Sequence, residues 1–180
     1  RSVGVTGVQT CALPICNAEV RVPEILVSNR SLDFGSGFYA ISSCDQAQRW
    51  AELQTGRRKT GVPTVNVYDF DLEKAANLAV RRFETADGSW LNFVAENRKN
   101  IYNGVKYDIV IGPVANDITM TVISDYIAGS ISEETALILL KPQRLTDQYA
   151  FLAVRGLSAL RFIEVKNYDK THASFNSTEF

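Results

Sequence analysis

The residues best suited to chemistry form a glycine-bracketed run at positions 32–39, which reads LDFGSGFY. Gly35 and Gly37 allow a close approach of the backbone that a Cβ atom would block, and Phe38 and Tyr39 follow at once. Such a loop can bring the main chain against a ligand. The alternative is a strand that turns tightly and places its aromatic rings in the core.

A second polar group stands at the start of an apolar strand, in the run TDQYAF at positions 146–151. Polar side chains beside aromatic ones at a strand end commonly build a ligand site. Neighbouring strand residues face opposite sides, so only one of Asp147 and Gln148 can enter such a site. The alternative is the ordinary polarity of a strand edge.

Several chemistries are excluded by what the sequence lacks. The HExxH, GxSxG, P-loop and GxGxxG motifs are missing. The single histidine, His172, lies near the C-terminal end, so the body of the chain has none for a Ser/His or Cys/His pair. Cys11, Cys16 and Cys44 are odd in number and lack CxxC spacing. We therefore expect no metal site, no disulfide framework and a reduced, cytoplasmic protein.

Size and charge indicate one globular domain without a strong field for nucleic acid. The 180 residues are 46% hydrophobic, and 19 basic against 20 acidic residues give a net charge of −1. One domain takes roughly 100–200 residues. No apolar run reaches the ~18–20 residues that cross a membrane, so we expect no membrane partner. The net charge does not indicate a nucleic acid partner, although a local patch such as Arg57-Arg58-Lys59 could contact one.

The elements that must position these residues alternate irregularly. We predict an extended segment at 18–27 and strands at 63–70, 78–83, 107–111, 148–154 and 160–166. The first predicted helix begins after Ser43 and runs to about Thr55, with Gly56 as the stop. A second helix is predicted after Asp87 or Ser89. Two more are predicted at 118–129, after Asp117, and at 133–140, after Ser132. This order differs from a doubly wound fold and predicts an α+β domain with a mixed or antiparallel sheet and flanking helices.

The first fifteen residues, RSVGVTGVQTCALPI, have neither helical nor strand periodicity. They resemble a peptide that recurs in metagenome-derived proteins when sequencing-adapter DNA is translated. We therefore predict an artefactual segment at 1–15, a domain at 16–166 and a polar, loose tail at 167–180. The alternative is a genuine N-terminal strand with the sequence VGVTGV.

Together the two polar blocks resemble the ADP-ribosyltransferase superfamily. In that superfamily a segment F-G-x-G-[FILV]-Y-F, followed by a helix with S-x-x-A, supplies the tyrosine of a His-Tyr-Glu signature. Residues 34–39 match this segment, and Ser43, Gln46 and Ala47 match the helix start. Gln148-Tyr149 matches the third element, with Gln where poly-ADP-ribosylating members carry Glu. The resemblance implies a single domain with split, mixed or antiparallel sheets.

More narrowly, residues 19–166 are similar to one bacterial family of unsettled function that is grouped with these transferases. The stretches that carry the similarity are LDFGxGFY, WA, VNVYxF, YDIVIGPVAND and the Asp-Gln-Tyr strand. That family opens with a strand ending near Tyr-His-Gly-Ser, whose histidine holds the NAD ribose. Residues 13–17 read LPICN instead, so we predict that this chain is truncated, has lost its first motif and is catalytically impaired.

The resemblance implies NAD as co-substrate and no metal. Tyr39 and Gln148 would be the catalytic residues, Tyr39 stacking against nicotinamide and Gln148 positioning the acceptor or binding the ribose 2′-hydroxyl. Gly35, Gly37 and Phe38 would lie against the dinucleotide. Because glutamine cannot act as a carboxylate base, single transfer, or mono-ADP-ribosylation, fits better than chain elongation.

Further candidates have structural alternatives. Ser42 and Ser43 could hydrogen-bond the ribose or the carboxamide, whereas Ser43 could simply cap a helix. Arg30 could bind a phosphate of NAD or be a solvated loop charge. Weaker candidates for the acceptor side of the cleft are Asn116, Asp117 and Asp147; Asp117 could equally be a helix cap.

Three functions compete. The first is an NAD-dependent mono-ADP-ribosyltransferase, of toxin or effector type and then secreted, that modifies an unknown protein or nucleic acid acceptor. The second is a non-catalytic domain of the same fold that binds a nucleotide or a partner. The third is an unrelated α+β binding module. The missing histidine favours the second for this chain, and the resemblance favours the first for its intact parent.

Overall fold

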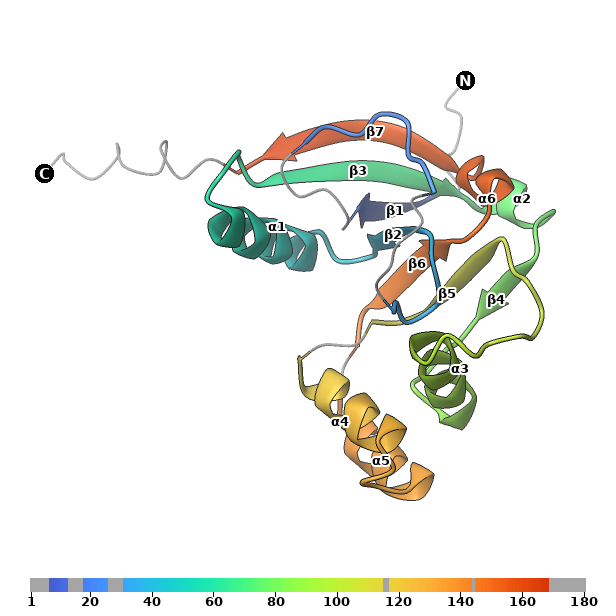
Figure 1. Cartoon of the computed structure of the whole chain (residues 1–180). Coiled ribbons are helices and arrows are strands. Elements are labelled where there is room, and N and C mark those ends of the chain that lie inside the picture. Colours follow the sequence, from blue (N-terminus) through green and yellow to red (C-terminus); the bar gives the residue numbers. More distant parts are fainter. Residues whose placement is uncertain (1–6, 13–17, 26–30, 115–116, 144, 169–180) are drawn as a thin grey trace, which may run out of the picture.

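The computed structural model describes residues 7–12, 18–25, 31–114, 117–143 and 145–168. Seven strands form one sheet, shown in Figure 1. In chain order the strands are β1 (Gly7–Ala12), β2 (Phe38–Ile41), β3 (Thr64–Asp71), β4 (Val80–Arg82), β5 (Ile109–Pro113), β6 (Asp147–Phe151) and β7 (Leu160–Asn167).

In space the strand order is β4-β5-β6-β2-β1-β3-β7. β4 and β5 run parallel, and the other neighbouring strands are antiparallel. In Figure 1, β3 and β7 run across the top while β4, β5 and β6 run obliquely below them. The prediction of an α+β domain with mixed and antiparallel strands is therefore confirmed.

Strand β1 lies inside the sheet, between β2 and β3. It pairs with β3 along residues 7–11 and with β2 at Cys11 and Ala12. The predicted alternative, a strand with the sequence VGVTGV at residues 3–8, lies mostly outside the described residues, and the described strand covers residues 7–12. The adapter origin of residues 1–15 stays a prediction.

Six helices accompany the strands in the described part of the chain. They are α1 (Cys44–Arg58), α2 (Leu72–Ala75), α3 (Gly88–Arg98), α4 (Asp117–Ile127), α5 (Glu133–Leu140) and α6 (Val154–Leu157). The predicted caps Ser43, Asp87 and Ser132 are confirmed, because each side chain accepts a hydrogen bond from a backbone N–H three residues later. The short helices α2 and α6 have too few residues to show a periodic pattern, and the sequence pattern does not predict them.

Both faces of the sheet are covered. On one face, Tyr39 of β2 belongs to a cluster that includes Trp90 and Leu91 of α3 together with residues of α4 and α5. Ile41, two residues further along β2 and therefore on the same face, packs with residues of α1. Phe38 lies on the other face, in a cluster completed by the segment 18–25 and α6.

Helix α1 ends later than the sequence predicts. Gly56 does not stop it; the helix continues to Arg58, and Lys59 adopts the left-handed conformation (φ 54°) while its N–H bonds to Thr55 O at 2.8 Å. The C-cap is thus made by a lysine, which the preference for glycine did not suggest. Cys44, the first residue of α1, is disulfide-bonded, so the expectation of a reduced chain is wrong at this position.

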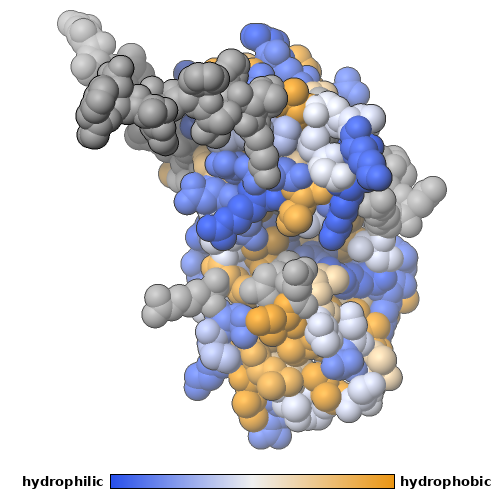
Figure 2. Space-filling model, turned by 90° about the vertical axis from the view of Figure 1, so that its left-hand side faces the viewer, coloured by the Kyte–Doolittle hydropathy of each residue, from blue (hydrophilic) through white to orange (hydrophobic). Residues whose placement is uncertain are grey.

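The surface is uneven in polarity. Figure 2 shows hydrophilic residues over the upper half of the face that it displays and a hydrophobic area over the lower half, where α4 and α5 lie. Ile118 of α4 and Ile138 of α5 are 61% and 64% exposed. Among the described residues, no helix has the length and apolar character needed to cross a membrane.

The Asp87 cap gives a first prediction. Its Oδ1 accepts hydrogen bonds from Trp90 N at 2.9 Å and from Ser89 Oγ at 2.8 Å, and these bonds, Trp90 first, hold its pKa below the ordinary 3.8. We expect Asp87→Ala to lower the free energy of unfolding by about 1 kcal/mol in urea titrations at pH 7. Asp87→Asn keeps the acceptor oxygen and should lose much less.

The contribution of Asp87 to the free energy of unfolding depends on pH in a defined direction. Because the pKa of Asp87 is lowered in the folded state, its stabilisation is present above the unfolded value and is lost as the pH falls through the folded value, below 3.8. The Asp87→Asn protein should lack this acid-induced loss. Equal destabilisation by alanine and asparagine at pH 7 would contradict the cap.

Candidate functional site

The two polar blocks of the sequence meet on neighbouring strands. In the pairing of β2 with β6, Tyr39 lies opposite Ala150 and Ile41 lies opposite Gln148. Opposed residues, and residues two apart on one strand, share a face of the sheet. Tyr39 and Gln148, which are far apart in the chain, are therefore on the same face.

Tyr39 holds the glycine loop in shape. Its hydroxyl donates a hydrogen bond to Gly35 O at 2.6 Å and accepts one from Phe34 N at 3.2 Å. The residue is 8% exposed, and burial raises the pKa of its phenol far above the ordinary value. Gly35 has φ +96°, a conformation that residues with a Cβ rarely adopt. The tyrosine thus closes a tight loop rather than presenting an open ring.

Gly37 is required by the neighbouring strand. A Cβ atom built at this position would lie 2.5 Å from Phe151 O and 2.9 Å from Leu152 Cδ2. The close backbone approach that the sequence indicates is therefore made at Gly37 to β6, whereas the resemblance implied an approach to a dinucleotide.

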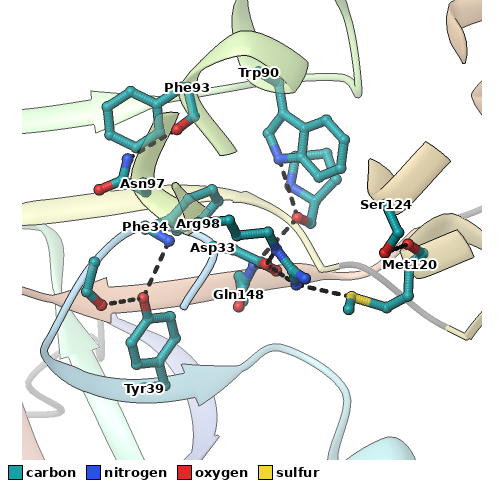
Figure 3. Close-up of polar contacts among 12 residues, drawn as sticks. Asp33, Phe34, Tyr39, Trp90, Phe93, Asn97, Arg98, Met120, Ser124 and Gln148 are labelled. Atoms are coloured by element: carbon teal, nitrogen blue, oxygen red, sulfur yellow. Dashed lines mark hydrogen bonds and ion pairs between the residues drawn. The ribbon is translucent and has the colours of Figure 1, made fainter. Parts of the chain in front are cut away.

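The side chain of Gln148 is held in a buried polar network, which Figure 3 shows. Its Nε2 donates to Asp33 Oδ2 at 3.1 Å and lies 3.4 Å from Pro113 O. The other carboxylate oxygen of Asp33 accepts from Arg98 Nε at 2.7 Å and also from Nη2. Gln148 and Asp33 are only 4% and 8% exposed, so the network joins the loop, α3 and β6 in the interior.

Sequence reasoning missed Asp33 and Arg98 as site residues. They lie 65 positions apart, and no local pattern links an acidic residue before a glycine loop with an arginine at the end of a helix. The one signal was the position of Asp33 within the run 32–39, two residues before Gly35. A buried carboxylate needs a cationic partner, and the pairing becomes visible only in the fold.

A cavity of about 380 Å³ opens at the start of α1, where the chain leaves β5 and enters β6. The residues that line it are Ser43, Asp45, Gln46, Arg49, Val114, Leu145 and Thr146. Thr146 donates a hydrogen bond to Gln46 Oε1 and accepts one from Val114 N through its carbonyl at 2.8 Å. In the sequence, Val114 directly follows Pro113 and Thr146 lies two positions before Gln148. Arg49 is the cationic side chain in this lining.

The predicted serines take structural roles. Ser43 Oγ accepts from Gln46 N at 3.3 Å, which is the helix cap given above as the alternative. It also lines the cavity, so both interpretations of Ser43 are compatible with its position. Ser42 is exposed and its Oγ lies 3.4 Å from Asp147 O.

Several predicted site residues are not brought to this face. Phe38 points to the opposite side of the sheet, where its ring packs edge-on against Tyr68 with centroids 5.7 Å apart. Asp147 binds Arg82 of β4, Oδ2 to Nη2, at 3.0 Å, so only Gln148 of the adjacent pair reaches the network. Arg30 and Asn116 lie outside the described residues, and the side chain of Asp117, the first residue of α4, is not described.

The described residues include no group of three or more His, Cys, Asp or Glu side chains that could hold a metal ion. The site is therefore built from an amide, a carboxylate–guanidinium pair and hydroxyl groups.

Fold and site together define an α+β domain in which a glycine loop and two adjacent strands meet beside a cavity at a helix start. Residues 16–162 match a family described as protein of unknown function (DUF3990), and the chain belongs to this family. No curated protein and no solved structure matches the chain.

The two kinds of glycine site give a matched pair of variants. We expect Gly37→Ala to lower the free energy of unfolding by about 1–3 kcal/mol, because its Cβ would collide with the backbone of β6. Gly56→Ala has open space around the new Cβ inside α1 and should stabilise by about 0.5–1 kcal/mol. Both values come from urea unfolding, and a Gly37→Ala protein as stable as the parent would refute the close contact.

Proposed function

We propose that this domain binds NAD and is an ADP-ribosyltransferase of the single-transfer type, acting on an acceptor of unknown identity. The observation that supports this most directly is the pairing of β2 with β6. It puts the two segments that resemble the transferase signature, around Tyr39 and Gln148, on one face of the sheet. Ser43, which follows β2, and Thr146, which precedes β6, line a cavity.

The reaction would break the bond between nicotinamide and ribose and transfer ADP-ribose to a nucleophile. Positive charge develops on the ribose in the transition state, so the site must hold the ribose firmly while the bond breaks. Gln148 can offer an amide hydrogen bond to a ribose hydroxyl or to the acceptor. It cannot remove a proton as a carboxylate would, which favours single transfer over elongation.

The cavity at the start of α1 fits the polar parts of such a ligand. Its volume of about 380 Å³ suits a nucleoside-sized group rather than a whole dinucleotide, so the rest of NAD would extend over the surface. Arg49 supplies a positive charge for a phosphate, while Ser43 and Thr146 carry hydroxyl groups. Phosphate binding by Arg30, and acceptor contacts by Asn116 and Asp117, remain part of the proposal.

Stacking of the Tyr39 ring on nicotinamide would need the loop to open. In the structure the ring is 8% exposed and the hydroxyl is engaged by Phe34 and Gly35. In the proposed enzyme, Tyr39 holds the glycine loop against β6 through its bonds to Phe34 and Gly35, and thereby fixes the shape of the site.

A second candidate is a non-catalytic domain that binds a nucleotide or a partner. Two observations favour it for this chain. The amide nitrogen of Gln148 is already engaged by Asp33, and the described strand β1, which lies next to β2, contains no histidine. The two candidates differ in whether bound NAD is consumed.

The test compares binding with turnover on the full chain. We expect titration calorimetry to detect NAD binding, and Gln148→Ala to weaken it by about tenfold, the effect of one lost hydrogen bond. Gln54→Ala on α1, a half-exposed glutamine outside the cavity lining, is the matched control and should bind like the parent.

Turnover is then followed with NAD labelled in the adenylate portion. Label incorporated into an added acceptor protein or RNA mixture supports the transferase, and binding without incorporation or nicotinamide release supports the non-catalytic domain. Absence of NAD binding at millimolar concentration would overturn the proposal.

A further inference from the structure

The amide of Gln148 has a fixed orientation. Its nitrogen faces two acceptors, Asp33 Oδ2 at 3.1 Å and Pro113 O at 3.4 Å. An ionised carboxylate and a carbonyl oxygen can only accept hydrogen bonds, so the group that faces them must donate. The amide oxygen of Gln148 must therefore point away from Asp33 and Pro113. Of the two polar atoms of this amide, the oxygen is the one available to contact a ligand.

The charge of Asp33 is balanced from α3. Arg98 contacts Oδ1 through Nε at 2.7 Å and through Nη2, while Oδ2 is left for Gln148. The side chains of Arg98 and Asp33 are 17% and 10% exposed. One guanidinium thus neutralises one carboxylate in a site with little solvent.

We propose that Asp33 is a positioning residue that makes position 148 specific for an amide and presents its oxygen as a hydrogen-bond acceptor. The ligand group that meets Gln148 must then be a donor, such as a ribose hydroxyl. This identification of the ligand group rests on the proposed NAD function, whereas the positioning by Asp33 does not.

A carboxylate at position 148 would conflict with Asp33. Two carboxylates about 3 Å apart cannot both stay ionised, so they share a proton and one pKa is strongly raised. Arg98 offsets the charge of only one of them. Glutamate at this position would therefore be held protonated near neutral pH or would strain the network, and it would not supply a base.

The test exchanges the two groups. Gln148→Glu creates the carboxylate pair, Asp33→Asn removes the charge, and the double variant Asp33→Asn/Gln148→Glu places the amide at 33 and the carboxylate at 148. In the double variant the new amide at position 33 can donate to the new carboxylate at position 148 and still accept from Arg98. The charge and the hydrogen bond between positions 33 and 148 are then restored with their positions swapped, while the contact of position 148 with Pro113 O is lost.

We expect Gln148→Glu to lower the folding equilibrium constant by on the order of 10- to 100-fold at pH 7. The loss should shrink toward pH 4.5, because a raised folded-state pKa means that the folded protein binds the extra proton more readily. In the double variant the pH-dependent loss should disappear. Its folding equilibrium constant should be at least tenfold higher than the value obtained by multiplying the effects of the two single changes. The measurements are urea titrations at both pH values.

Gln54→Glu is the control for adding a carboxylate on α1, away from Asp33, and should cost little at either pH. If Asp33→Asn fails to fold, the pH dependence of Gln148→Glu alone decides the matter. A loss from Gln148→Glu that is independent of pH, or no recovery in the double variant, would overturn the inference. NAD is absent from these titrations, so a failed NAD-binding test would refute the proposed function and leave the role of Asp33 standing.

Discussion

The buried carboxylate of Asp33 is the constraint on which the surroundings of the glycine loop depend. A charge with so little solvent contact is tolerated only when it is paired and hydrogen-bonded, and Arg98 and Gln148 supply both. These two partners come from α3 and β6, so satisfying one carboxylate fixes the loop between a helix and a strand. Removing Arg98 would leave an uncompensated buried charge, which usually costs more than a well-formed buried pair contributes.

The register of the central strands decides which side chains can act together. Tyr39, Ile41, Gln148 and Ala150 share one face because β2 and β6 are antiparallel neighbours with a fixed pairing. A shift of one residue would exchange the faces, bringing Asp147 to Asp33 in place of Gln148. The ion pair of Asp147 with Arg82, on the far side of the sheet, opposes such a shift.

Much of the fold could be predicted from short-range signals, whereas only part of the site could. The caps Ser43, Asp87 and Ser132 act on residues three positions away, and the strands carry runs of apolar residues, so both are visible locally. The pairing of Asp33 with Arg98 joins residues with no common local pattern. Phe38 shows another limit: the resemblance groups it with Tyr39, whereas alternation along β2 sends the two rings to opposite faces of the sheet.

The position of β1 between β2 and β3 also determines what the sheet requires of the sequence of this strand. Without β1, the neighbouring strands β2 and β3 would each present an unpaired edge at this position of the sheet. Such a position selects an extended backbone, since the pairing uses main-chain groups, and the packed faces on either side of the sheet select the side chains. Thr10 shows the cost of an imperfect fit: it is 0% exposed, yet its hydroxyl has no hydrogen-bond partner in the part of the chain that the structure describes. The place of β1 in the sheet is therefore held by its main-chain pairing with β2 and β3, to which the hydroxyl of Thr10 adds no hydrogen bond within the described residues.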